Sequence, residues 1–184
     1  CEERLQIMLD TEFSNLKNTL PNKYKESKFF AFCNTVESLN YHKTNQGKGW
    51  IGIRFQLEPK TEPNTVVLHV KMHDNSHKGQ QEALGILGVN LIHSCYHKNN
   101  DIDEFLDGLT RRVPRDRIEI DMLSLTGPDF SNIDNRVIAL NLVKRGITDA
   151  TMFDLSQNVL QPTNTLYKKN ILLTRGRFRP VTKV

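Results

Sequence analysis

The sequence predicts an α+β fold, with a mixed sheet of about five strands, two core helices and an N-terminal amphipathic helix. Apolar and polar residues alternate in several short segments, which is the period of a strand with one buried face. Residues 2–20 instead repeat apolar residues at the period of a helix. Two further segments, 80–96 and 133–145, are apolar on most sides and predict helices that other elements cover.

The composition limits the class of protein. Because the 184 residues contain no linker rich in Gly, Ser or Pro, we expect a single domain over residues 1–184. The 38% hydrophobic and 25% charged residues are typical of a soluble globular protein. No apolar run approaches the roughly 20 residues that span a bilayer, so we expect no membrane contact and a cytoplasmic location.

The cysteines and the chain ends indicate the context. Three cysteines without regular spacing argue against a disulfide framework and for a reducing compartment. The chain begins with Cys1 and ends in PVTKV, which resembles a strand. We therefore expect a piece of a longer protein, whose remainder is its first expected partner. The net charge of +4 is spread along the chain and favours acidic partners only weakly.

The N-terminal half predicts a helix followed by an antiparallel meander. The helix ends at Pro21 and presents one apolar stripe: Leu5, Leu9, Phe13, Leu16 and Leu20. Three strands follow, within 28–41, over 50–57 and over 66–72. The connections between them, HKTNQGKG and residues 59–64, have the composition of turns that join neighbouring antiparallel strands.

The second half predicts two core helices and further strands. Residues 80–96 form the first core helix, and 101–109 form a short amphipathic helix. Residues 117–146 predict a strand, a turn at Gly127-Pro128-Asp129 and the second core helix. A short helical turn is expected over 148–153, and a last strand over 164–175.

The strand that begins at Arg117 alternates clearly. Its apolar face consists of Ile118, Ile120 and Met122. Its polar face, which is expected to contact solvent, consists of Glu119, Asp121 and Ser124. Ser131 is the expected N-cap of the helix that follows, with Asp134 three residues later favouring its positive end.

The two core helices share a short pattern. LGVNLI at 87–92 matches IALNLV at 138–143 as apolar, small, apolar, Asn, apolar, apolar, and an alternating strand precedes each. If this is a duplication, the strands from Val66 and Arg117 lie in one sheet, joined by a right-handed crossover. The match is also short enough to arise by chance.

Acidic residues gather on the central strand and at the start of the next helix: Glu119, Asp121, Asp129 and Asp134. Oxygen-rich clusters suit Mg²⁺, which is therefore a candidate cofactor, and a carboxylate in such a place suits a general base. We take Asp129 and Asp134 as the candidate catalytic residues. The alternative is that the strand carboxylates simply face solvent while the other two cap a helix.

The same helix start offers free backbone amides, which bind anions in folds where a strand leads into a helix. The candidate phosphate-binding residues are Ser131, Asn132, Arg136, Arg145 and Lys168. The turn GPDFSN is neither a Walker A sequence nor a GxGxxG turn.

Other chemistries have weaker support. No metal site is expected, because the chain has no CxxC pair and Cys95 projects away from His97 on a helix. Cys33 and Cys95 are expected to be buried as small apolar side chains. Arginines cluster at 111–117 and in the tail from Arg175, but no RRM or KH signature accompanies them, so nucleic acid is not an expected partner.

Several phrases resemble, in order and over nearly the whole chain, the middle part of a poorly characterised bacterial protein family. They are GWIGIRFQLEP, QQEALGILGVNLI, RIEIDMLSLTGPDF, DNRVIALNLVKRGITDATMF and LYKKNILLTRGRFRPVT. Members of that family often carry the label nicotinate-nucleotide adenylyltransferase or TonB-dependent receptor. The resemblance implies a piece of a longer bacterial protein. The chain has neither the HxGH loop nor the ISSTxxR-like segment of a nucleotidyltransferase, so no catalytic residue is carried over.

Two functions follow from these observations. The first is an enzyme domain that handles a nucleotide or phosphate, such as nicotinate or nicotinamide mononucleotide, with the residues named above as its site. The second is a non-catalytic interaction or scaffold domain that contacts the rest of its own protein. We favour the first, because a strand, a turn and a helix start bring carboxylates and arginines close together in the sequence.

Overall fold

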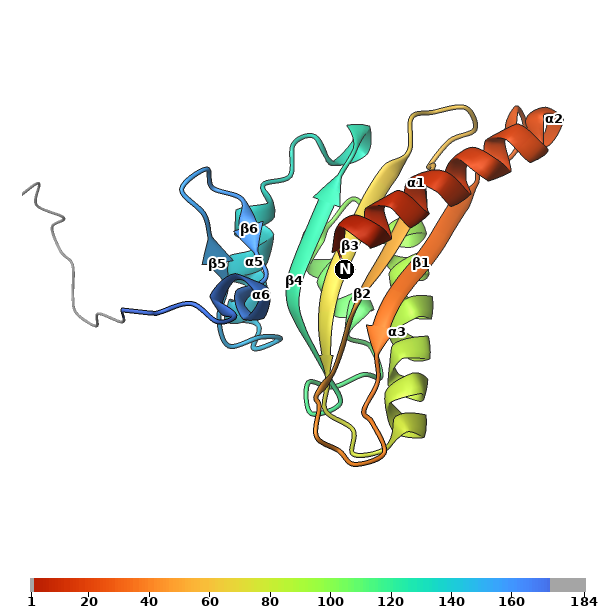
Figure 1. The fold of residues 1–184 in the computed structure, drawn as a ribbon. Helices are drawn as coiled ribbons and strands as arrows, with labels where there is room; N and C mark the ends of the chain where they lie inside the picture. The colour runs from red at the N-terminus through yellow and green to blue at the C-terminus, as the bar shows by residue number, and fades with distance from the viewer. Residues whose placement is uncertain (1, 173–184) are drawn as a thin grey trace, which may run out of the picture.

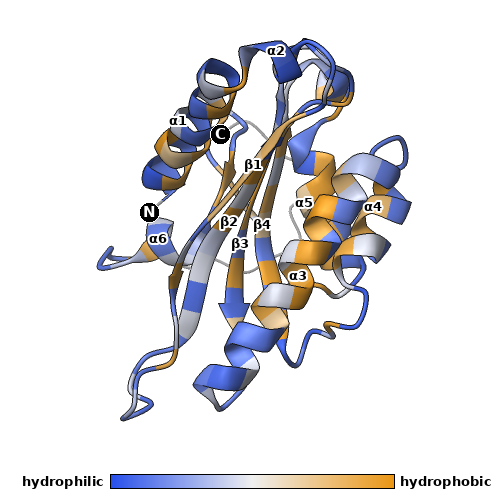
Figure 2. Cartoon of the chain, turned by 90° about the vertical axis from the view of Figure 1, so that its right-hand side faces the viewer, coloured by the Kyte–Doolittle hydropathy of each residue, from blue (hydrophilic) through white to orange (hydrophobic). Residues whose placement is uncertain are grey.

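The computed structural model describes residues 2–172 and has an α+β architecture of three layers (Figure 1). An antiparallel sheet of four strands, in the order β1-β2-β3-β4, forms the middle layer. The strands are β1 (Phe30–Glu37), β2 (Gly47–Phe55), β3 (Asn64–Met72) and β4 (Ile118–Thr126). One face carries α1 (Glu2–Thr19), and the short helix α2 (Pro21–Tyr24) follows it. The opposite face carries α3 (His77–His97), α4 (Ile102–Leu109) and α5 (Asn135–Lys144) (Figure 2).

The α+β class, the N-terminal helix and the meander are confirmed. The helix α1 buries Leu5, Leu9 and Phe13, as its stripe predicted. The strands β1, β2 and β3 pair with neighbours in sequence order. Glycine allows the close approach of β1 and β2, because a Cβ at Gly49 would lie 2.8 Å from the carbonyl oxygen of Thr35.

Among residues 2–172 the sheet has four strands and is antiparallel throughout, which corrects the expected mixed sheet of about five strands. β3 and β4 are neighbours, but they run in opposite directions. The chain leaves β3 along α3, and α4 with residues 110–117 brings it back to the end that it left. The His73 N–H then donates to the Arg117 carbonyl at 2.9 Å. A crossover connection joins parallel strands, so it must carry the chain back to the end of the sheet where the first strand begins. Here the chain enters β4 beside the end of β3, so the predicted right-handed crossover was wrong.

The C-terminal part also differs from the prediction. Residues 148–153, expected as a helical turn, include β5 (Met152–Phe153), which pairs with β6 (Val159–Leu160). The expected last strand over 164–175 begins within the helix α6 (Pro162–Leu166), because Pro162 occupies a first-turn position of that helix. Residues 173–175 of that prediction, and the arginine tail, lie outside the described residues.

The start of α5 lies later than predicted. Ser131 ends a 3₁₀ turn, η1 (Pro128–Phe130), and does not cap α5. Asp134 is the N-cap, and its carboxylate accepts from the Arg136 N–H at 2.9 Å. Asp134 therefore has the N-cap role that we predicted for Ser131.

A β-bulge in β4 changes which side chains share a face. His69 pairs with Met122 and Val70 with Ile120, so Asp121 has no partner in β3. As a result Ile118 and Ile120 join the core under α3, while Met122 packs on the α1 side of the sheet. The predicted grouping of Met122 with the two isoleucines was wrong, because simple alternation does not detect a bulge.

The polar face of β4 is covered, which corrects a second prediction. Asp121 is 1% exposed and Glu119 is 8% exposed. The residues that cover this face of β4 are Thr148 and Gln161, which come from the segment after α5. Cys33 and Cys95 are buried as expected. Within residues 2–172, no helix is both long enough and apolar enough to cross a membrane.

Candidate functional site

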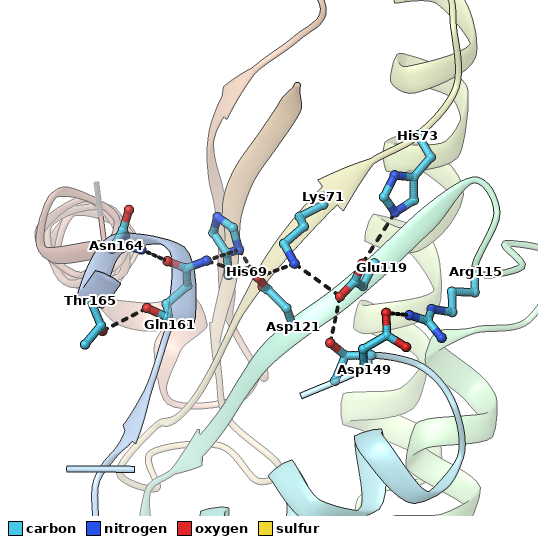
Figure 3. A network of polar contacts seen from close by, with 11 residues as sticks. His69, Lys71, His73, Arg115, Glu119, Asp121, Asp149, Gln161, Asn164 and Thr165 are labelled. Atoms are coloured by element: carbon cyan, nitrogen blue, oxygen red, sulfur yellow. Dashed lines mark hydrogen bonds and ion pairs between the residues drawn. The ribbon is translucent and has the colours of Figure 1, made fainter. Parts of the chain in front are cut away.

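Polar side chains from β3 and β4 form a network on the α1 side of the sheet (Figure 3). Lys71 stands two positions after His69 on β3, and Asp121 two positions after Glu119 on β4. Because residues two positions apart share a face of a strand, all four side chains project on the same side. The segment from Thr148 to Thr165 closes the network from beside β4.

The centre of the network is a buried pair between His69 and Asp121. The His69 Nδ1 lies 2.5 Å from the Asp121 Oδ1, and the two side chains are 4% and 1% exposed. The Gln161 Nε2 donates to the second carboxylate oxygen at 3.0 Å. Gln161 is itself oriented, because its Oε1 accepts from the Asn164 N–H at 2.6 Å.

These contacts determine which ring nitrogen carries hydrogen. A carboxylate only accepts, so the short contact requires a hydrogen on the His69 Nδ1. The Gln161 Nε2 also lies 3.4 Å from the His69 Nδ1. Because both nitrogens then carry hydrogen, they form no hydrogen bond with each other. Burial by itself raises the pKa of Asp121, but the hydrogen bonds and positive charges of its neighbours outweigh burial and hold that pKa below its ordinary value.

Lys71 connects this pair to a second carboxylate. Its Nζ lies 3.3 Å from the Asp121 Oδ2 and 3.2 Å from the Glu119 Oε1. Burial lowers the pKa of Lys71, but the two carboxylates outweigh burial and raise that pKa above its ordinary value. Glu119 also accepts from the Thr148 Oγ1 at 2.7 Å and lies 3.6 Å from the His73 Nε2. Every carboxylate oxygen of the network therefore has a partner.

The other nitrogen of His69 has no such partner. Among residues 2–172, no hydrogen bond to the His69 Nε2 is present. Figure 3 shows this nitrogen on the side of the ring away from Asp121. The Trp50 ring packs edge-on against the imidazole with 5.0 Å between ring centroids, which fixes the ring plane.

His69 forms part of the wall of a cavity of about 370 Å³ between α1, β1 and β2. The lining residues are Arg4, Met8, Asn34, Thr35, Val36, Glu37, Lys48, Gly49, Trp50, His69 and Asn164. Arg4 and Lys48 are exposed at this cavity, and neither forms an ion pair within the described part of the chain. The Thr35 Oγ1 is buried there without a hydrogen-bond partner. The cavity thus presents two cations, the Glu37 carboxylate and the His69 ring to a bound molecule.

The site residues predicted from the sequence lie elsewhere, and most have partners within the protein. Asp129 accepts from the Asn64 Nδ2 at 2.7 Å, which ties η1 to the start of β3. Asp134 pairs with Arg136 on its own helix, which lowers the pKa of that carboxyl to about 2. Arg136 also bonds Gln157. Ser131 and Asn132 are exposed in the turn before α5.

Arg145 and Lys168 do not converge with this group. Arg145 follows the last residue of α5 and pairs with Asp103 and Asp107 of α4. A helix of 10 residues is about 15 Å long, so Arg145 lies far from Asp134. Lys168 lies over the ring of Tyr167 at 5.2 Å. None of the seven predicted residues lines the cavity beside His69, and their roles in catalysis and phosphate binding stay predictions.

The sequence contained a signal for the network that was not used. His69 interrupts the apolar run VVLHV, and Asp121 interrupts IEIDML. A polar residue within a buried strand requires a polar partner, so two such residues on candidate neighbouring strands point to each other. Gln161 gave no signal, because it reaches the pair from 92 positions away in the chain. Within the described residues, no group of three or more His, Cys, Asp or Glu side chains has the geometry of a metal site.

No protein-family model matches the chain, no curated protein matches it, and no solved structure matches it.

Proposed function

We propose that the cavity beside His69 binds a small phosphorylated molecule of the mononucleotide class, and that His69 exchanges a hydrogen bond or proton with it. The observation that carries the proposal is the unpartnered Nε2 of a buried ring whose other nitrogen is held by Asp121. This arrangement orients an imidazole for general acid–base work. Nicotinate and nicotinamide mononucleotides are the first ligands to test.

The charges at the cavity support an anionic ligand. Arg4 and Lys48 supply two positive groups at its wall and Glu37 supplies one negative group, so the lining carries a net positive charge. The His69 ring, whose Nδ1 is held by Asp121, presents its Nε2 for a hydrogen bond with the ligand. The volume of about 370 Å³ is at the lower end of the range for small-molecule sites.

The His69→Asn substitution separates the two roles of the ring. The Asn Nδ2 occupies a place close to that of the His Nδ1 and keeps a donor for Asp121, while the atom that addresses the cavity is lost. We expect the variant to fold and its affinity for the mononucleotide to fall about 10- to 100-fold, since a hydrogen bond to a charged group contributes about 1.5–3 kcal/mol.

Isothermal titration with mononucleotides, sugar phosphates and inorganic phosphate measures this effect. The double variant Arg4→Gln with Lys48→Gln is expected to weaken binding of every phosphorylated ligand. Lys25→Gln, which removes an exposed charge outside the cavity, is the matched control and is expected to bind as the wild type does. Equal affinity of His69→Asn and wild type, or no binding by the wild type, would contradict the proposal.

A second candidate function is contact with the remainder of a longer protein. Large apolar side chains are exposed on the C-terminal part of the described chain: Leu155, Tyr167, Ile171 and Leu172. Exposed apolar groups of this kind are typical of interaction surfaces. If this reading holds, a polypeptide that includes the flanking regions of the native protein co-purifies with residues 1–184, and substitution of Leu155 and Ile171 by Ser abolishes that association.

A further inference from the structure

One side-chain amide joins the segment after α5 to the buried pair of His69 and Asp121 (Figure 3). Gln161 is 5% exposed and stands at the N-cap of α6. Its Nε2 donates to the Asp121 Oδ2 at 3.0 Å, and its Oε1 accepts from the Asn164 N–H at 2.6 Å. Both ends of the amide are therefore used, one inside the network and one within its own helix.

These two contacts fix the direction of the amide. If its oxygen and nitrogen changed places, the oxygen would face the Asp121 carboxylate, which only accepts. The NH₂ group would face the Asn164 N–H, which only donates. Because neither contact would then be a hydrogen bond, Gln161 presents its donor to Asp121.

The orientation of the Asp121 carboxylate determines how His69 faces the cavity. The Asp121 Oδ1 lies 2.5 Å from the His69 Nδ1, so a rotation of the carboxylate would break the contact that holds the ring. Gln161 and Lys71 both contact the other oxygen, Oδ2, and oppose that rotation. Lys71 is shared with Glu119, whereas the Gln161 NH₂ group contacts only the pair.

The same residue connects the pair to the wall of the cavity. Asn164 lines the cavity beside His69, and its backbone N–H is the donor that Gln161 accepts. Two residues before Gln161, Val159 of β6 packs against the apolar cluster that contains Trp50. The segment is thus held on the sheet at the point where it contacts the site.

We propose that Gln161 is a positioning residue of the ligand site, which holds the Asp121 carboxylate in the orientation that keeps the free Nε2 of His69 directed at the cavity. This inference rests on the proposed function of the cavity. It adds a residue that does not itself line the cavity. Ligand affinity then depends on a hydrogen-bond donor at residue 161 as well as on the charges of the wall.

The Gln161→Asn substitution tests the donor alone. Asparagine is a favoured N-cap, so its oxygen keeps a contact within α6. Its side chain is one CH₂ group shorter, so its NH₂ group no longer reaches Asp121. We expect the variant to fold and its affinity for nicotinamide mononucleotide to fall about 10-fold. Gln161→Met removes both contacts at a similar volume and is expected to lose at least as much affinity.

Gln80 supplies the matched control. It is 1% exposed, its Oε1 accepts from the Leu39 N–H at 2.8 Å, and its Nε2 donates to the Asp74 carbonyl at 2.9 Å. Gln80→Asn therefore shortens an equally buried and equally bonded amide that lies outside the cavity beside His69. We expect this variant to have a lower melting temperature but to bind nicotinamide mononucleotide as the wild type does.

A double-mutant cycle separates positioning from a general loss of stability. If Gln161 acts through the ring, Gln161→Asn lowers the affinity of the wild type but causes no further loss in the His69→Asn variant. Isothermal titration of the four proteins with nicotinamide mononucleotide measures this. An equal loss in both backgrounds, or no loss in either, overturns the proposal.

A measurement without ligand tests Gln161 independently of the proposed function. By ¹⁵N NMR of the free protein, we expect the hydrogen on the His69 Nδ1 in the wild type and in Gln80→Asn, and a mixture of both tautomers in Gln161→Asn. The wild-type tautomer in Gln161→Asn overturns the inference. A wild type that binds no mononucleotide but shows the expected change of tautomer contradicts the proposed function and leaves the positioning role of Gln161 supported.

Discussion

At the scale of single residues, the molecule depends on a buried charged group that is fully paired. Asp121 accepts from His69 and Gln161 and lies beside Lys71, so its two oxygens have partners from two strands and from a distant segment. A paired charge of this kind contributes little by comparison with an apolar core, but removal of one member leaves the others buried without compensation. This makes Asp121 the residue whose substitution tests the network most sharply.

We predict that Asp121→Asn destabilises the protein by about 2–4 kcal/mol, because the amide keeps only one acceptor oxygen for Lys71 and His69 and carries no negative charge. Urea unfolding at neutral pH measures the change. Asn100→Ala, an exposed asparagine before α4, serves as control and is expected to cost less than about 0.5 kcal/mol.

The pH dependence of the same variant has a defined sign. The pKa of Asp121 is lower in the folded protein than in the unfolded chain, so its contribution is complete above about pH 4 and is lost as the pH falls through the folded pKa. The wild type should lose stability in that acid range more steeply than Asp121→Asn. Parallel acid curves for the two proteins would show that the carboxylate is not paired.

At the scale of elements, the approach of β1 to β2 depends on a glycine. A Cβ at Gly49 would lie 2.8 Å from the Thr35 oxygen and 2.8 Å from the Val36 Cα, and backbone atoms cannot move aside cheaply. We predict that Gly49→Ala costs about 1–3 kcal/mol through overpacking. Gly85 is the control, because nothing lies within 4 Å of its added Cβ and it sits inside α3. Gly85→Ala should stabilise the protein by about 0.5–1 kcal/mol.

Urea unfolding of the two variants beside the wild type measures these effects. Equal and small effects of both substitutions would mean that β1 and β2 are farther apart than the register requires.

At the scale of the whole molecule, sequence patterns correctly predicted the helices and strands that depend mainly on neighbouring residues. The stripe of Leu5, Leu9 and Phe13 specified α1, and alternation with turn residues specified the meander. The predictions that were wrong concern features that depend on contacts between distant segments. The bulge at Asp121, the return of the chain through α4 and the covering of β4 by Gln161 cannot be detected in any window of neighbouring residues.

The same division applies to the candidate site. Asp129 and Asp134 were chosen because they lie close together in the sequence, but the fold gives each a separate structural partner. His69 and Asp121 are 52 positions apart and meet only because β3 and β4 are adjacent. A site assembled across strands is predicted only once strand order and direction are known.

The role proposed for His69 is tested most directly by a ¹⁵N NMR measurement on its ring, with and without a mononucleotide. We predict that the Nδ1 carries the hydrogen in the free protein and that the Nε2 resonance shifts as ligand is added, with no such shift for the exposed His42. A hydrogen on Nε2 alone in the free protein, or an Nε2 resonance that does not move at saturating ligand, would contradict the proposed role of His69.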